Sequence, residues 1–359
     1  MKKLLAVLVS LVMVFSVLGL IGCGNGGDAP APAETPAAEA ETPDEGGEAP
    51  AATGERQLIA FSQGESGNSW RATNTEDMEY WAERAGFDFV WADGNNDAMQ
   101  QLADIENLLA LNPDILIVAP LQADAITPAV QMSRDAGIPM ITIDRALSVP
   151  PDGEYYLAMI EQDFVEVGRL GALRTVEKLT ELYGEPRGRV LEIQGTIGAS
   201  PAIDQAAGVR EILDQFPDIE IVDAQSGNYN RAESRAVMDD FLIRHPEGTV
   251  DILITHCDDG ALGALQAMRD AGRTDLYGRI ISKNGMRTAL TEVIAGTIDV
   301  TYACPPRFGE VTMELVRKIL NGEPFEAFND MPFETFDMRE NRARTLEHYE
   351  YLTENNLDF

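Results

Sequence analysis

The sequence from residue 56 onward predicts an α/β fold made of two doubly wound lobes, each built on a parallel sheet. Short β-rich runs alternate with amphipathic stretches, as in parallel sheets covered by helices on both faces. The run Asp-Ile-Leu-Ile-Val-Ala at 114–119 is apolar after its first residue, as in a strand buried on both faces. The same alternation then restarts along the chain, which predicts a second lobe.

Four strands and three helices are expected in the first half of this region. The strands are predicted at 57–62, 87–92, 114–119 and 140–143. The helices are predicted at 73–85, 98–111 and near 126–136. Gly86 and the pair Asn112-Pro113 are typical helix stop signals, so they fix the ends of the first two helices.

The second half repeats the pattern with five strands and six helices. The strands are predicted at 189–194, 219–225, 251–255, 279–282 and 299–303. The helices are predicted near 165–182, 202–215, 231–244, 261–271, 287–295 and 309–320. Ligands of doubly wound sheets bind beyond the carboxyl ends of the strands, so the residues that follow each strand are the candidate site.

The N-terminus has the features of a secretory signal. Lys2 and Lys3 precede an apolar run at 4–18, and the tetrapeptide at 20–23 reads Leu-Ile-Gly-Cys. A charged start, an apolar middle and a small residue before the cut define such signals, and a cysteine directly after the small residue is the lipobox of bacterial lipoproteins. We expect removal of residues 1–22 and lipidation of Cys23. A plain signal peptide or an uncleaved anchor helix are the alternatives.

Residues 23–55 are predicted to form a disordered tether behind the lipid. The stretch 24–55 holds eight acidic residues and no Lys or Arg, and it is rich in Pro, Ala and Gly. It cannot bury a core, and its like charges repel each other. The protein is therefore expected outside the cytoplasm and held at the membrane. This location disfavours ATP-driven chemistry, DNA binding and cytosolic metabolism.

Composition restricts the function further. The net charge of −33 argues against a nucleic-acid partner, because binding to phosphates needs a basic surface. Three cysteines are too few for a disulfide-dense scaffold. With Cys23 assigned to the lipid, Cys257 and Cys304 remain, and they are either bridged or free; we favour free thiols that face the ligand.

The residues after the predicted strands are mostly small, polar, charged or aromatic. Recognition of a sugar needs this mixture, because each hydroxyl that leaves water must be satisfied as donor and acceptor. The apolar face of a sugar ring prefers an aromatic partner, for which Trp70 and Tyr229 are available. We place Trp70 in a polar loop after the first strand. The alternatives are a core role for Trp70, a structural Asp144–Arg145 pair, and a generic small-molecule site.

The motifs at these strand ends resemble those of bacterial sugar-binding proteins of the ribose-binding and galactofuranose-binding type, the soluble receptors of ABC importers. The resemblance runs from about Leu58 to beyond Pro306. The matching stretches are Phe61-Ser62-Gln63, Trp70-Arg71, Ala92-Asp93-Gly94, Ile143-Asp144-Arg145, Gln194-Gly195-Thr196-Ile197-Gly198-Ala199-Ser200, Ala202-Ile203-Asp204, Gln225-Ser226-Gly227, Asp258-Asp259 and Leu262-Gly263-Ala264. The Gln-Gly-Thr-x-Gly-Ala-Ser stretch and Trp70-Arg71 favour the galactofuranose branch.

The resemblance implies a type I periplasmic binding fold, with a three-stranded hinge and a sugar clamped between the lobes. It implies an N-terminal lobe at 56–160 with 305–332, and a C-terminal lobe at 161–304 with 333–359. The expected ligand-binding residues are Glu65, Asn68, Trp70, Arg71, Asp144, Arg145, Ser200, Gln205, Tyr229, Cys257, Asp258, Asn284 and Cys304. The family usually has Arg, Asn and Asp where this chain has Gln205, Cys257 and Asn284, which leaves the identity of the sugar open.

Other chemistry is not indicated by the sequence. The three histidines have no metal-ligand spacing, so we expect no metal and no cofactor. The neighbours Asp258 and Asp259 do not by themselves make a hydrolase pair. We therefore predict a non-enzymatic monomer that captures a monosaccharide and delivers it to an ABC permease. The alternative is a receptor of the same fold that presents a sugar or furanosyl signal to a sensor kinase or chemoreceptor.

Overall fold

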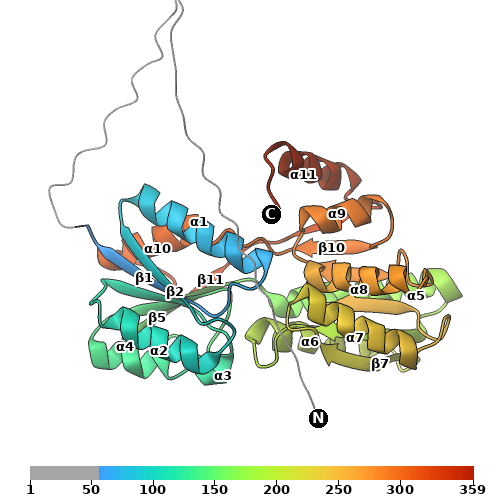
Figure 1. Cartoon of the computed structure of the whole chain (residues 1–359), viewed down its shortest axis with the longest axis horizontal. Helices are drawn as coiled ribbons and strands as arrows, with labels where there is room; N and C mark the ends of the chain where they lie inside the picture. Colours follow the sequence, from blue (N-terminus) through green and yellow to red (C-terminus); the bar gives the residue numbers. More distant parts are fainter. Residues whose placement is uncertain (1–55) are drawn as a thin grey trace, which may run out of the picture. The chain divides into compact units, whose positions relative to one another are not determined.

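The computed structural model describes residues 56–359 of the chain, which contain two six-stranded sheets (Figure 1). The predicted signal, Cys23 and the tether lie outside the described residues. The sheets have the strand orders β11-β5-β4-β3-β1-β2 and β12-β10-β9-β8-β6-β7. Within residues 56–359, neighbouring strands of these sheets pair in parallel, except that β12 pairs with β10 in the antiparallel direction. The predicted class, two parallel-sheet α/β lobes, is confirmed.

The first sheet and its helices form what we call the N-terminal lobe. Its elements are β1 (Leu58–Gln63), α1 (Ser69–Ala85), β2 (Asp88–Asp93), α2 (Ala98–Leu109), β3 (Ile115–Ala119), α3 (Ala123–Ile126), α4 (Ala129–Ala136), β4 (Met140–Ile143), β5 (Tyr156–Glu161), α10 (Gly309–Leu320) and β11 (Phe328–Asp330). Every residue of β3 is buried, as its apolar sequence predicts.

The second sheet and its helices form the C-terminal lobe. Its elements are α5 (Phe164–Tyr183), β6 (Gly188–Gln194), α6 (Ser200–Leu213), β7 (Ile219–Ser226), α7 (Arg231–Arg244), β8 (Ile252–Thr255), α8 (Asp258–Asp270), β9 (Ile280–Lys283), α9 (Arg287–Ile294), β10 (Val300–Ala303), β12 (Glu334–Asp337) and α11 (Arg342–Glu354). The chain passes between the sheets after β5, after β10 and after β11, which makes three connections.

Two local differences from the sequence prediction affect the site. Helix α1 begins at Ser69, four residues earlier than expected, because the Asn68 side chain accepts a hydrogen bond from the Arg71 N–H and caps the first turn. Trp70 and Arg71 therefore lie in a helix, and their placement in a loop was wrong. The helix expected near 126–136 is two helices, because Pro128 precedes α4 and has no N–H to continue α3.

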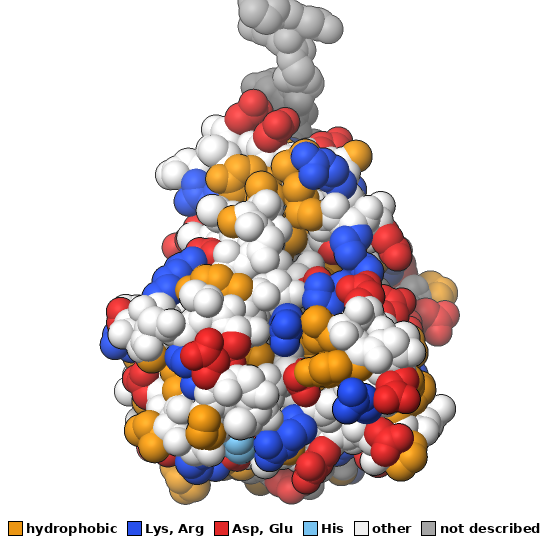
Figure 2. Space-filling view, turned by 90° about the vertical axis from the view of Figure 1, so that its right-hand side faces the viewer, with side chains coloured by type: hydrophobic (Ala, Val, Ile, Leu, Met, Phe, Trp, Pro, Cys, Tyr) orange, Lys and Arg blue, Asp and Glu red, His pale blue; other side chains and the backbone are white. Residues whose placement is uncertain are grey.

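The surface of the described residues carries intermixed charges. Figure 2 shows acidic and basic side chains interspersed over one face. Ion pairs such as Arg244 with Asp240 and Arg235 with Asp270, each 2.8 Å between nitrogen and oxygen, illustrate this mixing on α7 and α8. On these helices, acidic side chains are thus paired with a neighbouring base.

Candidate functional site

A cavity lies where the strand ends of both lobes meet. Its walls are formed by Asn68, Trp70, Arg71, Asp144, Arg145, Gln162, Phe164, Pro201, Tyr229, Cys257, Asp259, Lys283, Asn284 and Cys304. Most follow a strand or begin the next helix, as expected for ligands of doubly wound sheets. The structure therefore brings together most of the residues singled out in the sequence.

The N-terminal wall is a buried ionic network. Arg71 pairs with Asp144, and Arg145 Nη2 donates to Glu65 Oε1 at 2.7 Å. All four side chains are at most 7% exposed. The Asp144–Arg145 pair weighed in the sequence is secondary, because Arg145 Nε lies 3.7 Å from Asp144 Oδ2. The closer ion pairs, Arg71 with Asp144 and Arg145 with Glu65, link α1 and the β1–α1 loop to the end of β4.

Burial affects the two arginines of this network differently. Burial and the nearby Arg145 charge lower the pKa of Arg71. Burial also acts to lower the pKa of Arg145, but the carboxylates of Glu65 and Asp144 overcome it and raise that pKa. Each guanidinium keeps one buried nitrogen, Nη1 of Arg71 and Nε of Arg145, without a hydrogen-bond partner among the described residues. These unused donors are available to a ligand.

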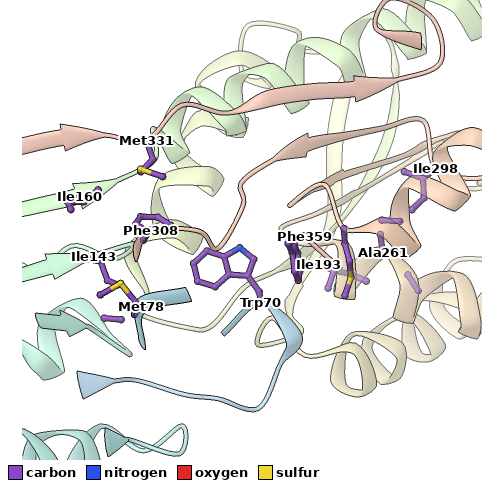
Figure 3. Close-up of a cluster of buried hydrophobic side chains, with 14 of the residues drawn as sticks. Trp70, Met78, Ile143, Ile160, Ile193, Ala261, Ile298, Phe308, Met331 and Phe359 are labelled. Carbon is purple, nitrogen blue, oxygen red and sulfur yellow. The ribbon is translucent and has the colours of Figure 1, made fainter. Parts of the chain in front are cut away.

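Trp70 belongs to both the core and the cavity wall. Its indole N–H donates to the Cys304 carbonyl at 2.7 Å, and the ring packs edge to face on Phe308 (Figure 3). The Arg71 guanidinium lies 4.7 Å from the centroid of the indole ring. The core role and the sugar-stacking role weighed for Trp70 are therefore compatible, since the side chain is 8% exposed and still lines the cavity.

Tyr229 forms an aromatic part of the C-terminal wall. Its ring occupies space that only a glycine at position 195 leaves free, since a Cβ there would come within 2.0 Å of the ring. The Tyr229 hydroxyl is buried and has no partner among residues 56–359. Burial raises the pKa of this hydroxyl far above its ordinary value, so it stays a neutral group that can both donate and accept.

The two cysteines expected at the site, Cys257 and Cys304, are both free and both line the cavity. The sulfur of Cys257 accepts a hydrogen bond from the Gly260 N–H at 3.2 Å and thereby caps α8. Burial raises the pKa of each thiol to about 12, so both are neutral at ordinary pH. They make this wall smaller and less polar than the opposite one.

Four of the expected ligand residues do not line the cavity, and in three of them the polar side-chain group is held by other residues of the protein. Glu65 is engaged by Arg145, and the Ser200 hydroxyl accepts the Ala146 N–H at 2.8 Å. Gln205 lies where α5 and α6 touch, since a Cβ on Gly168 would meet its carbonyl at 2.2 Å.

Asp258 is the fourth, and its carboxylate is fully occupied. It accepts hydrogen bonds from Ser282, Thr301 and the Met286 N–H. Burial raises its pKa to about 7. The neighbouring Asp259 lines the cavity instead and pairs with Arg231 at 2.6 Å.

Sequence reasoning missed Gln162, Phe164, Pro201, Asp259 and Lys283. Gln162 and Phe164 follow β5, a strand that the pattern did not reveal. Pro201 and Asp259 each adjoin a residue that was chosen. Lys283 was part of a recognised strand end, Lys283-Asn284-Gly285, from which only Asn284 was selected. The sequence signal for Lys283 was its position directly after the strand predicted at 279–282.

Two further features bear on the class of protein. Among residues 56–359, no cluster of three or more His, Cys, Asp or Glu side chains is arranged to hold a metal ion. In the same part of the chain, no helix has the length and apolar character needed to cross a membrane. Two α/β lobes with a polar cavity between their strand ends define a two-lobed ligand-binding protein.

The family follows from the sequence itself. The pattern of the family described as "Periplasmic binding protein domain" matches residues 59–324. The chain belongs to this family, which comprises binding proteins and not enzymes. Galactofuranose-binding protein YtfQ of Escherichia coli (strain K12) is 33% identical over 60% of this chain and 66% of its own length. Ribose import binding protein RbsB of Bacillus subtilis (strain 168) is 28% identical over 74% of this chain and 82% of its own length.

Solved structures agree with this assignment. A galactofuranose-binding protein superposes with a TM-score of 0.74 at 26% identity, over 82% of this chain and 99% of its own. The arabinose-transporter binding protein of Shewanella sp. ANA-3, solved with L-arabinofuranose, gives a TM-score of 0.75 at 26% identity, over 83% and 97%. The fructose-binding periplasmic domain of the hybrid two-component system BT1754 gives a TM-score of 0.73 at 25% identity, over 84% of this chain and 97% of its own.

Proposed function

We propose that the protein is an extracytoplasmic solute-binding protein that captures a monosaccharide between its lobes and delivers it to an ABC permease. The observation that carries this proposal is the cavity, which combines a buried Arg–carboxylate network with aromatic side chains. Its relatives named for galactofuranose and ribose support the sugar class.

The cavity offers what a sugar needs on both kinds of surface. Arg71, Asp144 and Asn284 present charged and amide groups that satisfy hydroxyls as donor or acceptor. Trp70 and Phe164 present rings to the apolar face of the sugar. We assign ligand contacts to these five residues and to Asn68, Arg145, Tyr229, Cys257 and Cys304, which share the cavity.

Binding is expected to favour the arrangement in which the lobes touch. Hydrogen bonds that join the lobes include those from the Ala123 N–H to the Gly198 carbonyl at 2.9 Å, from the Gln122 amide to the Ile197 carbonyl at 2.9 Å, and from the Ala146 N–H to the Ser200 hydroxyl. A sugar that contacts both walls binds this arrangement more tightly than an open one. That differential affinity shifts the equilibrium toward closure.

Anchoring through a lipid on Cys23 is part of the proposal. It rests on the Leu-Ile-Gly-Cys sequence at 20–23 and the apolar run before it. Mass spectrometry of the mature chain tests it, because a diacylglycerol-modified Cys23 at the new N-terminus is expected. An unmodified residue there, or an intact Met1, would contradict the anchor without affecting the sugar site.

A sugar receptor in signalling is the second candidate function. The similarity to the periplasmic domain of a two-component system favours it. The cavity would act in the same way, but the closed lobes would contact a sensor protein and not a permease. Genes for a permease and an ATPase beside this one would favour transport.

A thermal-shift screen with a panel of pentoses and hexoses tests the sugar-binding function. A ligand at a hundredfold excess over its Kd stabilises the folded state by about 2.7 kcal/mol. At least one sugar is therefore expected to raise the melting temperature by several degrees. If no sugar in the panel shifts the transition, the proposal fails.

A further inference from the structure

Lys283 places a buried positive charge in the cavity. It is the last residue of β9, it is 5% exposed, and it lines the cavity. Its Nζ lies 4.4 Å from the centroid of the Phe164 ring and 5.4 Å from that of Tyr229. The ammonium group is thus held between two aromatic side chains of the C-terminal wall.

The other charged side chains of the cavity are compensated by opposite charges. Arg71 pairs with Asp144, Arg145 with Glu65, and Asp259 with Arg231. Within residues 56–359, Lys283 has no carboxylate at ion-pair distance, and its Nζ donates no hydrogen bond. The charges around the cavity therefore leave one positive charge in excess.

Within the described part of the chain, neither Asp258 nor the two cavity thiols forms an ion pair with Lys283. Asp258 is occupied by Ser282, Thr301 and the Met286 N–H, and burial raises its pKa to about 7. Burial also keeps the thiols of Cys257 and Cys304 neutral, with pKa values of about 12. The faces of Phe164 and Tyr229 attract a cation but carry no net charge.

A buried charge without a partner is costly, so a ligand that brings the opposite charge gains affinity. The excess is a single charge, which fits a monoanion better than a dianionic phosphate. Unused nitrogens of Arg71 and Arg145 add donors on the facing wall. These donors suit a ligand that is richer in acceptor oxygens than a neutral sugar.

We propose that the preferred ligand is a sugar carrying one carboxylate, such as a uronic or aldonic acid, with the carboxylate bound by Lys283. This inference rests on the proposed sugar-binding function and narrows it to a ligand class. Lys283 then decides between acidic and neutral sugars, whereas the network of Arg71, Asp144 and Arg145 holds the hydroxyls common to both.

Calorimetry on the full-length chain tests the inference with matched pairs of probes. The pairs are D-galacturonate with D-galactose, D-galactonate with D-galactose, and D-ribonate with D-ribose, and D-galactose 1-phosphate tests the dianion. A charge-assisted hydrogen bond to the carboxylate predicts that the acid of at least one pair binds about tenfold or more tightly than its neutral partner. The phosphate is expected to bind more weakly than that acid.

Two lysine variants identify the source of the preference. Lys283→Met removes the charge while keeping the length of the chain, and it should abolish most of the acid-to-neutral affinity ratio. Lys318→Met on α10 is the matched control, because the side chain of this lysine is 42% exposed, pairs with Glu314 and does not line the cavity. It should keep the wild-type ratio.

Each outcome bears on one of the two claims. If no acid binds more tightly than its neutral partner, or if Lys283→Met keeps the ratio, the anionic-ligand inference is overturned and sugar binding stands. If the phosphate binds more tightly than every acid, the carboxylate assignment is overturned. If no probe binds, and the panel of neutral sugars also fails, sugar binding itself is refuted. Should Lys283→Met not fold, the wild-type pairs still decide.

Discussion

The two walls of the cavity differ in how their polar groups are satisfied. On the N-terminal side, Arg71, Asp144, Arg145 and Glu65 neutralise one another in a buried network. On the C-terminal side, Lys283 has no ionic partner among residues 56–359, and the Tyr229 hydroxyl has no hydrogen bond there. The charges of the N-terminal wall are balanced without a ligand, whereas the C-terminal wall keeps a positive charge that the protein does not pair within the described residues.

This difference separates folding from recognition. A network whose charges depend on one another must stay intact for the lobe to fold, because removing one partner leaves a buried charge. Groups that the protein leaves unsatisfied contribute little to folding and remain available to a ligand. We therefore expect changes to the N-terminal wall to reduce stability and binding together, and changes to the C-terminal wall to act mainly on binding.

The largest effect is expected for Asp144→Asn. The change leaves Arg71 buried without its carboxylate, so the free energy of unfolding should fall by about 3–5 kcal/mol. Asp240→Asn is the matched control, because Asp240 pairs with Arg244 on the exposed face of α7 and its side chain is 52% exposed. Urea denaturation measures both variants. A loss below about 1 kcal/mol in Asp144→Asn would remove the contrast between the walls.

Trp70→Phe is expected to have the next largest effect. The phenyl ring preserves the contact with Phe308 but loses the indole N–H that satisfies the Cys304 carbonyl. A buried acceptor left alone should cost about 1–3 kcal/mol of unfolding free energy. Trp91→Phe in β2 is the control, since Trp91 is 42% exposed. Equal denaturation midpoints for the two variants would show that the hydrogen bond is unimportant.

A pH effect is expected at Glu161, the last residue of β5, where the chain leaves the N-terminal lobe. Burial, and then the charges of Asp204, Asp144, Asp330 and Asp163, raise its pKa from 4.5 to about 7. A carboxyl group whose pKa is raised by folding stabilises the folded state below pH 4.5, and this stabilisation is lost as the pH rises through 7. Glu161→Gln should therefore be more stable than wild type at pH 8, by roughly 1–2 kcal/mol.

Denaturation at pH 4 and pH 8 measures this difference. The variant and the wild type should converge at pH 4, and the exposed Glu79→Gln should match the wild type at both values. Asp258 has a pKa raised in the same direction, so some pH dependence persists in Glu161→Gln. The assignment is wrong if Glu161→Gln and wild type differ equally at both pH values.

The smallest effect on folding is expected for Tyr229→Phe. The change removes a buried hydroxyl that has no partner within residues 56–359, so the stability of the empty protein should stay the same or rise by up to about 1 kcal/mol. Sugar affinity should fall by about fivefold to tenfold, because a ligand hydrogen bond is lost. Urea denaturation measures the stability of the empty protein, and calorimetry measures its affinity for the sugar. A destabilised variant would show that this wall also supports the fold.

Much of the fold could be predicted from the sequence because its strands are continuously apolar. The run at 115–119 is buried throughout, and the strand expected at 140–143 has those bounds in the structure. The pattern missed β5, β11, β12 and α11. The short strands β11 and β12 have three and four residues and are partly exposed, so they carry too little apolar sequence to give a periodic signal.

The candidate site was harder to predict because the position of a residue after a strand does not reveal which side chain it forms an ion pair with. Asp144 and Arg145 are neighbours in sequence, yet their main partners are Arg71 and Glu65, which lie 73 and 80 positions earlier in the chain. Asp258 and Asp259 are also neighbours, but only Asp259 reaches the cavity. Phe164 follows a strand that was not recognised, so nothing in the local pattern pointed to it.

Calorimetric titration with the sugar that stabilises the protein most tests the central claim most directly. The wild type and Asp240→Asn should show saturable binding at a single site. Asp144→Asn, at a temperature where circular dichroism shows it folded, should bind at least about thirtyfold more weakly, because truncating one member of a buried charge pair costs about 2–5 kcal/mol. Wild-type affinity in folded Asp144→Asn would contradict the placement of the sugar between these walls.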